Sequence, residues 1–190
     1  MKELRTAEIR ANTSAEGDAL VLAGRAIVFD EPTTINDPAG SYIEIIQRGA
    51  LDQADLSDVR LLYDHDTTRV PLARTPKTMQ LSISSVGLDF RAVLPETNSA
   101  KEVYEAVKRG DLSGCSFAFK VPEGGDSYDP ATNTRTIKQI SKVYECSVVV
   151  FPAYQTTSVE ARSAITKSKS RYEAKRQAHI LINQIRKELI

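Results

Sequence analysis

The sequence predicts an α+β domain in which strands predominate and helices are few. Its 190 residues suffice for one domain with a real core rather than for two. Short runs of β-branched, aliphatic and aromatic residues recur between clusters of Gly, Pro, Asn and Asp, which is typical of strands joined by turns. One segment before Arg162 carries clear start and stop signals for a helix. After Arg162 the composition becomes small, polar and basic, and a second helical pattern follows.

The strands are expected to form mostly antiparallel pairs. Gly24 indicates a bulge in the first of them, and Val86-Gly87 indicates a tight hairpin turn. The run from Val148 to Phe151 is apolar on both faces, which favours a central, buried strand. Residues 30–41 are expected to form the longest loop. The predicted strands are 19–29, 42–46, 59–63, 79–84, 88–94, 112–121, 134–141 and 143–151.

The one helix expected in the body covers residues 100–109. Ser99 and Glu102 have the S-x-x-E spacing of a capping box. An apolar stripe from Val103 to Val107 has helical spacing. Gly110 then supplies the residue at which a left-handed backbone ends a helix.

The C-terminal part divides into a linker, residues 163–170, and a tail, residues 171–190, after a body of residues 1–162. In the tail, Ala178, Leu181, Ile185 and Leu189 repeat at three or four residues, which predicts an amphipathic helix. From Lys167 onward there are seven basic and two acidic residues, so the neutral total charge hides an acidic body and a basic end. Such a helix must dock on the body, on another copy or on a partner to cover its apolar face.

Several functional classes lack support in the sequence. The start of the chain has no apolar segment typical of a secretory signal, and no run approaches the length of a membrane span. The two histidines and two cysteines have no zinc-ligand spacing, and nucleotide-binding glycine loops and G-x-S-x-G are absent. We expect an intracellular protein without metal or cofactor, with Cys115 and Cys146 as buried free thiols. Neither a membrane nor a nucleic acid is an expected partner.

Three side chains have the chemistry of a serine hydrolase, which needs a hydroxyl, a base and a group that holds the base. His65 follows the strand 59–63 and is the only histidine of the body. Strand alternation places Ser116 with Ala118 on one face and Cys115, Phe117 and Phe119 on the core face. Ser116 is then expected to face outward or into a cleft. Glu145 precedes a strongly apolar segment, so its carboxylate needs a partner.

The residues alone leave alternatives open. His65 also fits a surface loop between two acids, and Ser116 fits an ordinary strand serine. Ser113 competes as nucleophile, although its loop position favours a role in the turn. Asp64 and Asp66 compete with Glu145 as the orienting acid. The hydrolase hypothesis requires the strand of Ser116 to run beside the exit of the strand that ends near His65.

Five short motifs in this order resemble the prohead protease family of HK97-type tailed phages, which is distantly related in fold to herpesvirus assembly proteases. They are GRAIVFDEPT at 24–33, YIEIIQRGAL at 42–51, LLYDHD at 61–66, SGCSFAF at 113–119 and YECSVVVFPA at 144–153. The resemblance runs from about Leu20 to Arg162. With the strand pattern, it leads us to expect a barrel or half-barrel.

The resemblance implies a serine endopeptidase with His65 as base and Ser116 as nucleophile. The herpesvirus relatives use a second histidine as the third member, which this body lacks, so Glu145 takes that role. Cys115 stands where the family more often has an aliphatic residue, which keeps a cysteine hydrolase as an alternative.

Further expectations follow from the same resemblance. The protease is packaged inside the prohead in the host cytoplasm. There it cleaves the scaffold-like segment of the major capsid protein and itself, and it associates with these partners and with other copies. A non-enzymatic capsid-assembly module on the same fold is the alternative.

Overall fold

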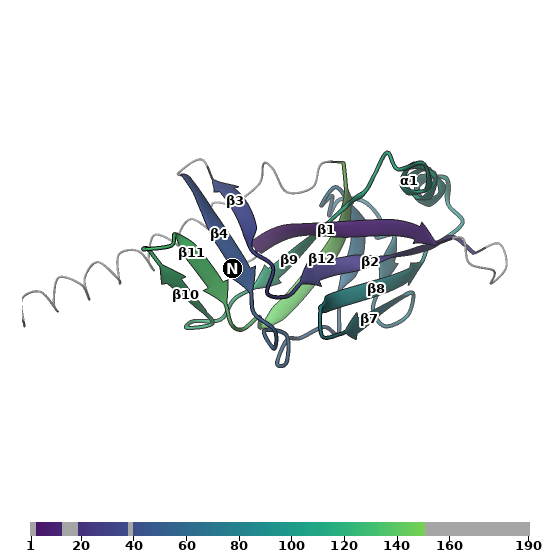
Figure 1. The fold of residues 1–190 in the computed structure, drawn as a ribbon. Helices are drawn as coiled ribbons and strands as arrows, with labels where there is room; N and C mark the ends of the chain where they lie inside the picture. The colour runs from purple at the N-terminus through teal and green to yellow at the C-terminus, as the bar shows by residue number, and fades with distance from the viewer. Residues whose placement is uncertain (1–2, 13–18, 38–39, 151–190) are drawn as a thin grey trace, which may run out of the picture.

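The computed structural model describes residues 3–12, 19–37 and 40–150, which form two sheets and one helix (Figure 1). The main sheet has eight strands in the order β6-β5-β12-β9-β1-β2-β8-β7, and the second has four in the order β10-β11-β4-β3. Figure 1 shows the second sheet at one side and the helix, α1, at the opposite end. The elements are β1 Glu3–Asn12, β2 Val21–Val28, β3 Thr33–Asp37, β4 Gly40–Ile46, β5 Arg60–Tyr63, β6 Ala73–Arg74, β7 Met79–Ile83, β8 Gly87–Val93, α1 Asn98–Arg109, β9 Gly114–Lys120, β10 Asp126–Asp129, β11 Thr134–Ile137 and β12 Lys142–Val149.

The predicted β-rich fold with mostly antiparallel strands and few helices is confirmed; of the expected barrel or half-barrel, a closed barrel is not formed by the described strands. Among the strands of the described residues, only β5 with β12 and β4 with β11 pair in parallel. Within the described residues the main sheet keeps two open edges, β6 and β7, and does not close on itself. The predicted linker and amphipathic tail, residues 163–190, lie outside the described residues. The part of the chain that the structure describes contains no helix with the length and apolarity that crossing a membrane requires.

The main core lies between the sheet and α1. Ala100, Val103, Tyr104 and Val107 of the helix pack into the same buried cluster as the core faces of β5, β9 and β12. On β9 this face carries Phe117 and Phe119, whose rings stack with their centroids 5.3 Å apart. The core therefore fixes which face of β9 is left for Ser116.

Two local predictions are corrected. The helix begins two residues earlier than expected, because its N-cap is Thr97, which accepts the N–H of Ala100, and not Ser99. Gly110 ends it in the left-handed region, as predicted (φ 84°). The bulge of β2 falls between Arg25 and Ile27 and not at Gly24.

The segment 30–41 is not one long loop. Residues 33–37 form β3, which pairs with β4 as a hairpin. The predicted hairpin of residues 79–94 is present, and Gly87 closes it. A Cβ at Gly87 would lie 1.9 Å from the carbonyl oxygen of Ile27, so the close approach of β2 requires glycine here.

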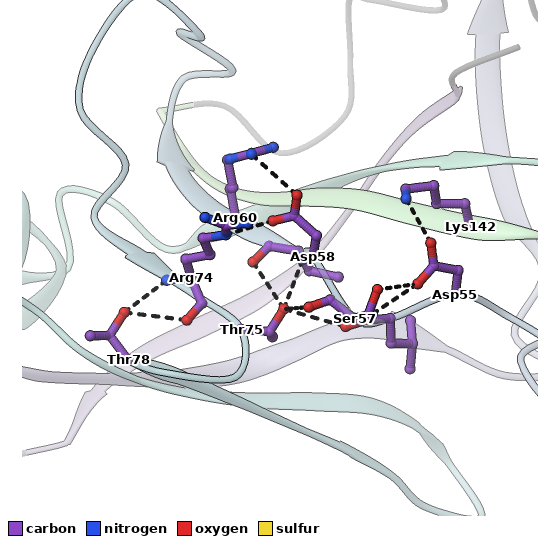
Figure 2. A network of polar contacts seen from close by, with 10 residues as sticks. Asp55, Ser57, Asp58, Arg60, Arg74, Thr75, Thr78 and Lys142 are labelled. Carbon is purple, nitrogen blue, oxygen red and sulfur yellow. Dashed lines mark hydrogen bonds and ion pairs between the residues drawn. The ribbon is translucent and has the colours of Figure 1, made fainter.

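A polar network fixes the start of β5 (Figure 2). Asp58 binds Arg74 Nε at 2.7 Å and Arg60 at 3.2 Å, which joins β5 to β6. The buried Thr75 hydroxyl oxygen accepts the N–H of Val59 at 2.8 Å and lies within 3.1 Å of the Ser57 carbonyl, to which it donates. Asp55 and Lys142 join this end of the network to β12 at 2.6 Å. The network holds β5 in register at the end opposite His65.

Candidate active site

The site is built around β12, which lies between β5 and β9. Ser147 of β12 pairs with Leu62 of β5 on one side and with Ser116 of β9 on the other. The sequence hypothesis required the strand of Ser116 to run beside the strand that leads to His65. In the structure β12 separates these two strands. Paired residues project from the same face of a sheet, so Ser116 and Ser147 share a face.

His65 lies in a tight turn just after β5. Asp64 and His65 both have positive φ, 51° and 59°, a conformation that non-glycine residues seldom adopt. The Asp64 N–H donates to the carbonyl of Val148 at 2.8 Å, so the turn stays attached to β12. The two left-handed residues reverse the chain and let the imidazole reach back over the sheet.

Glu145 receives that imidazole. His65 Nδ1 lies 2.9 Å from Glu145 Oε1, and the Glu145 side chain is only 2% exposed, against 22% for His65. The other carboxylate oxygen, Oε2, accepts a hydrogen bond of 2.8 Å from Ser147 Oγ. Because Glu145 and Ser147 touch, His65 is held on the face of the sheet that also carries Ser116.

Ser116 is more enclosed than the sequence indicated. The residue is 3% exposed, and every residue from Gly114 to Phe119 is buried. The predicted alternation nevertheless holds, since Ser116 pairs with Ser147 while Cys115 and Phe117 join the core cluster. A rigid interior strand therefore carries the hydroxyl.

Asp66, one of the two competing acids, makes other contacts. Asp66 Oδ1 accepts hydrogen bonds from the Thr68 N–H and hydroxyl, and its Oδ2 pairs with Arg69 at 3.1 Å. The Thr68 hydrogen bonds hold the pKa of Asp66 below its ordinary value. Asp66 thus stabilises the turn, and Glu145 is the acid that touches His65.

The two cysteines are free and buried, as predicted. They lie on the core face, away from Ser116. A hydrogen bond with Cys115, together with burial, raises the pKa of the Cys146 thiol well above its ordinary value. Among the described residues no three His, Cys, Asp or Glu side chains gather as a metal site.

A cavity of about 450 Å³ opens beside the His65 turn. The turn contributes Tyr63 and Asp66 to its wall, and α1 contributes Glu102, Val103 and Ala106. Its volume falls within the range of ligand pockets, about 300–1,000 Å³.

Comparisons with known proteins cover most of the chain. Residues 5–173 match the family model described as caudovirus prohead serine protease. The chain belongs to this family. A curated relative, the "Prohead protease" of Enterobacteria phage HK97, is 26% identical over 169 residues, covering 87% of this chain and 70% of that protein. No solved structure matches the chain.

In this member of the caudovirus prohead serine proteases, the geometry fixes the tautomer of the neutral histidine. A carboxylate only accepts hydrogen bonds, so the proton of His65 sits on Nδ1 opposite Glu145 Oε1. The lone pair of Nε2 is then available to take a proton, which is the state that a general base requires.

Sequence reasoning missed one polar residue of the site, Ser147. Its place two residues after Glu145 on a strand puts both on one face, and this spacing is the signal that would have found it. The register with Ser116, by contrast, depends on pairing between distant segments.

Proposed function

We propose that the chain is a serine endopeptidase that cleaves the scaffold-like segment of the major capsid protein during prohead maturation. The observation that carries the proposal is the 2.9 Å contact of His65 with the buried Glu145, on the sheet face that carries Ser116. Membership of a serine protease family supports the same reaction.

The reaction proceeds through an acyl-enzyme. His65 Nε2 takes the hydroxyl proton of Ser116 while Oγ attacks the scissile carbonyl carbon. Glu145 stabilises the imidazolium that forms, and His65 then returns the proton to the leaving amine. Water, activated by the same imidazole, hydrolyses the ester and releases the second fragment. Because Ser116 is 3% exposed, substrate binding has to open access to its hydroxyl.

The family membership supports a substrate and partners in the prohead. We propose the major capsid protein as substrate, with cleavage inside the assembling shell, and the chain itself as a second substrate. Residues 163–170 then serve as a linker and 171–190 as a basic amphipathic tail that docks on the scaffold or coat.

Co-assembly with the major capsid protein tests the proposal. Wild-type chain is expected to yield shortened capsid protein by intact-mass spectrometry, whereas Ser116→Ala and His65→Ala leave it at full length. Ser113→Ala is the matched control and retains cleavage. If Ser116→Ala chains cleave as wild type does, the nucleophile is wrong. If none of the chains cleaves but shells assemble normally, the non-enzymatic assembly module is the better description.

A further inference from the structure

We propose that Ser147 is a positioning residue that holds the Glu145 carboxylate in the plane required by His65. The inference rests on the proposed function, because it assigns Ser147 a role in that reaction. Its direct evidence is the hydrogen bond of 2.8 Å from Ser147 Oγ to Glu145 Oε2, while Oε1 lies 2.9 Å from His65 Nδ1.

The need for such a residue comes from the flexibility of glutamate. The last torsion of a glutamate side chain is broad, because it joins a tetrahedral carbon to a planar group. Fixing the backbone of β12 therefore does not fix the plane of the carboxylate. A contact on each oxygen does, and Ser147 and His65 each supply one such contact.

The surroundings make the Ser147 contact rigid. Ser147 is fully buried, and its strand lies between β5 and β9 with both neighbours paired. A buried donor close to a carboxylate forms one of the stronger classes of hydrogen bond. Loss of a hydrogen bond to a charged group corresponds to a rate change of about ten- to a hundred-fold.

The geometry also separates this role from that of a nucleophile. The Ser147 hydroxyl donates its hydrogen to Glu145, so its proton points toward the acid and not toward a base. Ser116, which pairs with Ser147 in the sheet, makes no such donation to Glu145 among the hydrogen bonds of the described residues. In the proposed reaction it is Ser116 whose proton His65 takes.

The test uses the full chain and a fluorophosphonate, which reacts with activated serine hydroxyls. Ser147→Ala is expected to lower the maximal rate of modification about ten- to a hundred-fold, with little change in the probe concentration at half-maximal rate. Ser147→Thr keeps the hydroxyl and is expected to restore most of the rate. Val149→Ala, on the same face of β12 and also buried, is the control for simple loosening of the strand.

A double-mutant cycle and a spectroscopic readout make the test specific. In a Glu145→Ala background, Ser147→Ala is expected to have no further effect, because Ser147 acts through the carboxylate. We expect the downfield proton NMR signal of His65 Nδ1–H to be present in wild type and in Ser147→Thr. In Ser147→Ala we expect this signal to be broadened or shifted. This signal reports the contact even when the protein does not react with the probe.

The outcomes separate the two proposals. An unchanged rate and an unchanged His65 signal in Ser147→Ala would overturn the role of Ser147, as would a full effect in the Glu145→Ala background. Covalent modification of Ser147 itself would make it a nucleophile and would also overturn the inference. Absence of modification in wild type, with the His65 signal still dependent on Ser147, counts against the proposed hydrolase and leaves the positioning contact supported.

Discussion

At the scale of single residues, the contact between His65 and Glu145 orients a histidine that lies in a turn. Glu145 sits on a strand interior to the sheet and is almost fully buried, so its position is set by β12 rather than by the loop. His65 is set by two left-handed backbone positions. The turn thus gains a partner on an interior strand.

Replacing the acid without changing its shape tests this contact. Glu145→Gln can donate from its amide nitrogen, which allows the wrong tautomer of His65. We expect the cleavage rate of the capsid protein to fall by about a hundred-fold or more, while thermal unfolding shows a folded protein. Retention of the wild-type rate would show that Glu145 does not orient the base.

The turn of His65 also predicts a pH dependence. The Thr68 hydrogen bonds lower the pKa of Asp66 from its ordinary value of 3.8. A lowered folded-state pKa contributes stability that is present above pH 3.8 and is lost as the pH falls through the lower value. Proton–carbon NMR titration of the Asp66 carboxyl is expected to give a midpoint below 3.8, and Thr68→Ala to raise it. A midpoint at or above 3.8 in wild type would contradict the turn geometry.

The sequence predicted His65, Ser116 and Glu145 as candidates because each carries a chemical demand that is readable locally. A buried acid needs a partner, and a histidine at a strand exit is suited to act as a base. The choice of Glu145 over Asp66 as the contact of His65 was open from the residues alone, because it depends on where the loop turns back. Only the three-dimensional arrangement shows Asp66 bound to Thr68.

At the scale of elements, β9 carries the Ser116 hydroxyl on one face and the Cys115 thiol on the other. Ser116 shares a face with Ser147, and Cys115 lies in the core beside Cys146. We expect both thiols to resist iodoacetamide at pH 8 in the folded protein, because the raised pKa keeps Cys146 protonated and burial excludes the reagent. Cys115→Ala is expected to retain cleavage. Loss of activity in that variant, with the fold intact, would favour a cysteine hydrolase.

The polar network at the start of β5 leads to a prediction about stability. Thr75→Val keeps the shape of the side chain but removes the acceptor of the buried Val59 N–H. We expect the free energy of unfolding to fall by about 1–3 kcal/mol, measured by urea denaturation. Thr78→Val, which alters an exposed hydroxyl of the same network, is the matched control with a smaller effect. Equal effects of the two variants would show that burial of Thr75 is unimportant.

The elements that sequence patterns predicted are those with a strong local signal. The helix was found because its apolar stripe and Gly110 agree, but its start was misplaced, because both Thr97 and Ser99 are capping residues by type. β3 was missed because Thr33–Asp37 lies within turn-forming residues and gains its strand conformation from pairing with β4. Tertiary pairing overrode local propensity there.

At the scale of the whole molecule, a buried arginine that pairs with two acids holds the second sheet together. Arg135 is 1% exposed and binds Glu44 at 3.0 Å and Asp126 at 2.7 Å. These contacts join β11 to β4 and β10. Ile46 and Ile137 then carry the sheet into the main core.

Replacing Arg135 is expected to destabilise the fold. Arg135→Met leaves Glu44 buried without this cation, and we expect the free energy of unfolding to fall by about 3–5 kcal/mol. Lys120→Met, which removes an exposed cation from the end of β9, is the control. A loss below 1 kcal/mol for Arg135→Met would show that the small sheet tolerates the loss of this buried cation.

The overall architecture was the least predictable feature. Strand patterns and turns gave the β-rich class, yet whether a sheet closes depends on long-range order of strands that no local pattern encodes. Insertion of β12 between β5 and β9 likewise follows from pairing across distant segments. That same insertion places Glu145 on the sheet face that also carries Ser116.

The most direct measurement is the site of covalent modification by a fluorophosphonate, mapped by peptide mass spectrometry on the full chain. The adduct is expected on Ser116, and its formation is expected to be lost in His65→Ala and retained in Ser113→Ala. An adduct on another residue, or one on Ser116 that forms at the wild-type rate without His65, would contradict the assignment of this hydroxyl and imidazole as nucleophile and base.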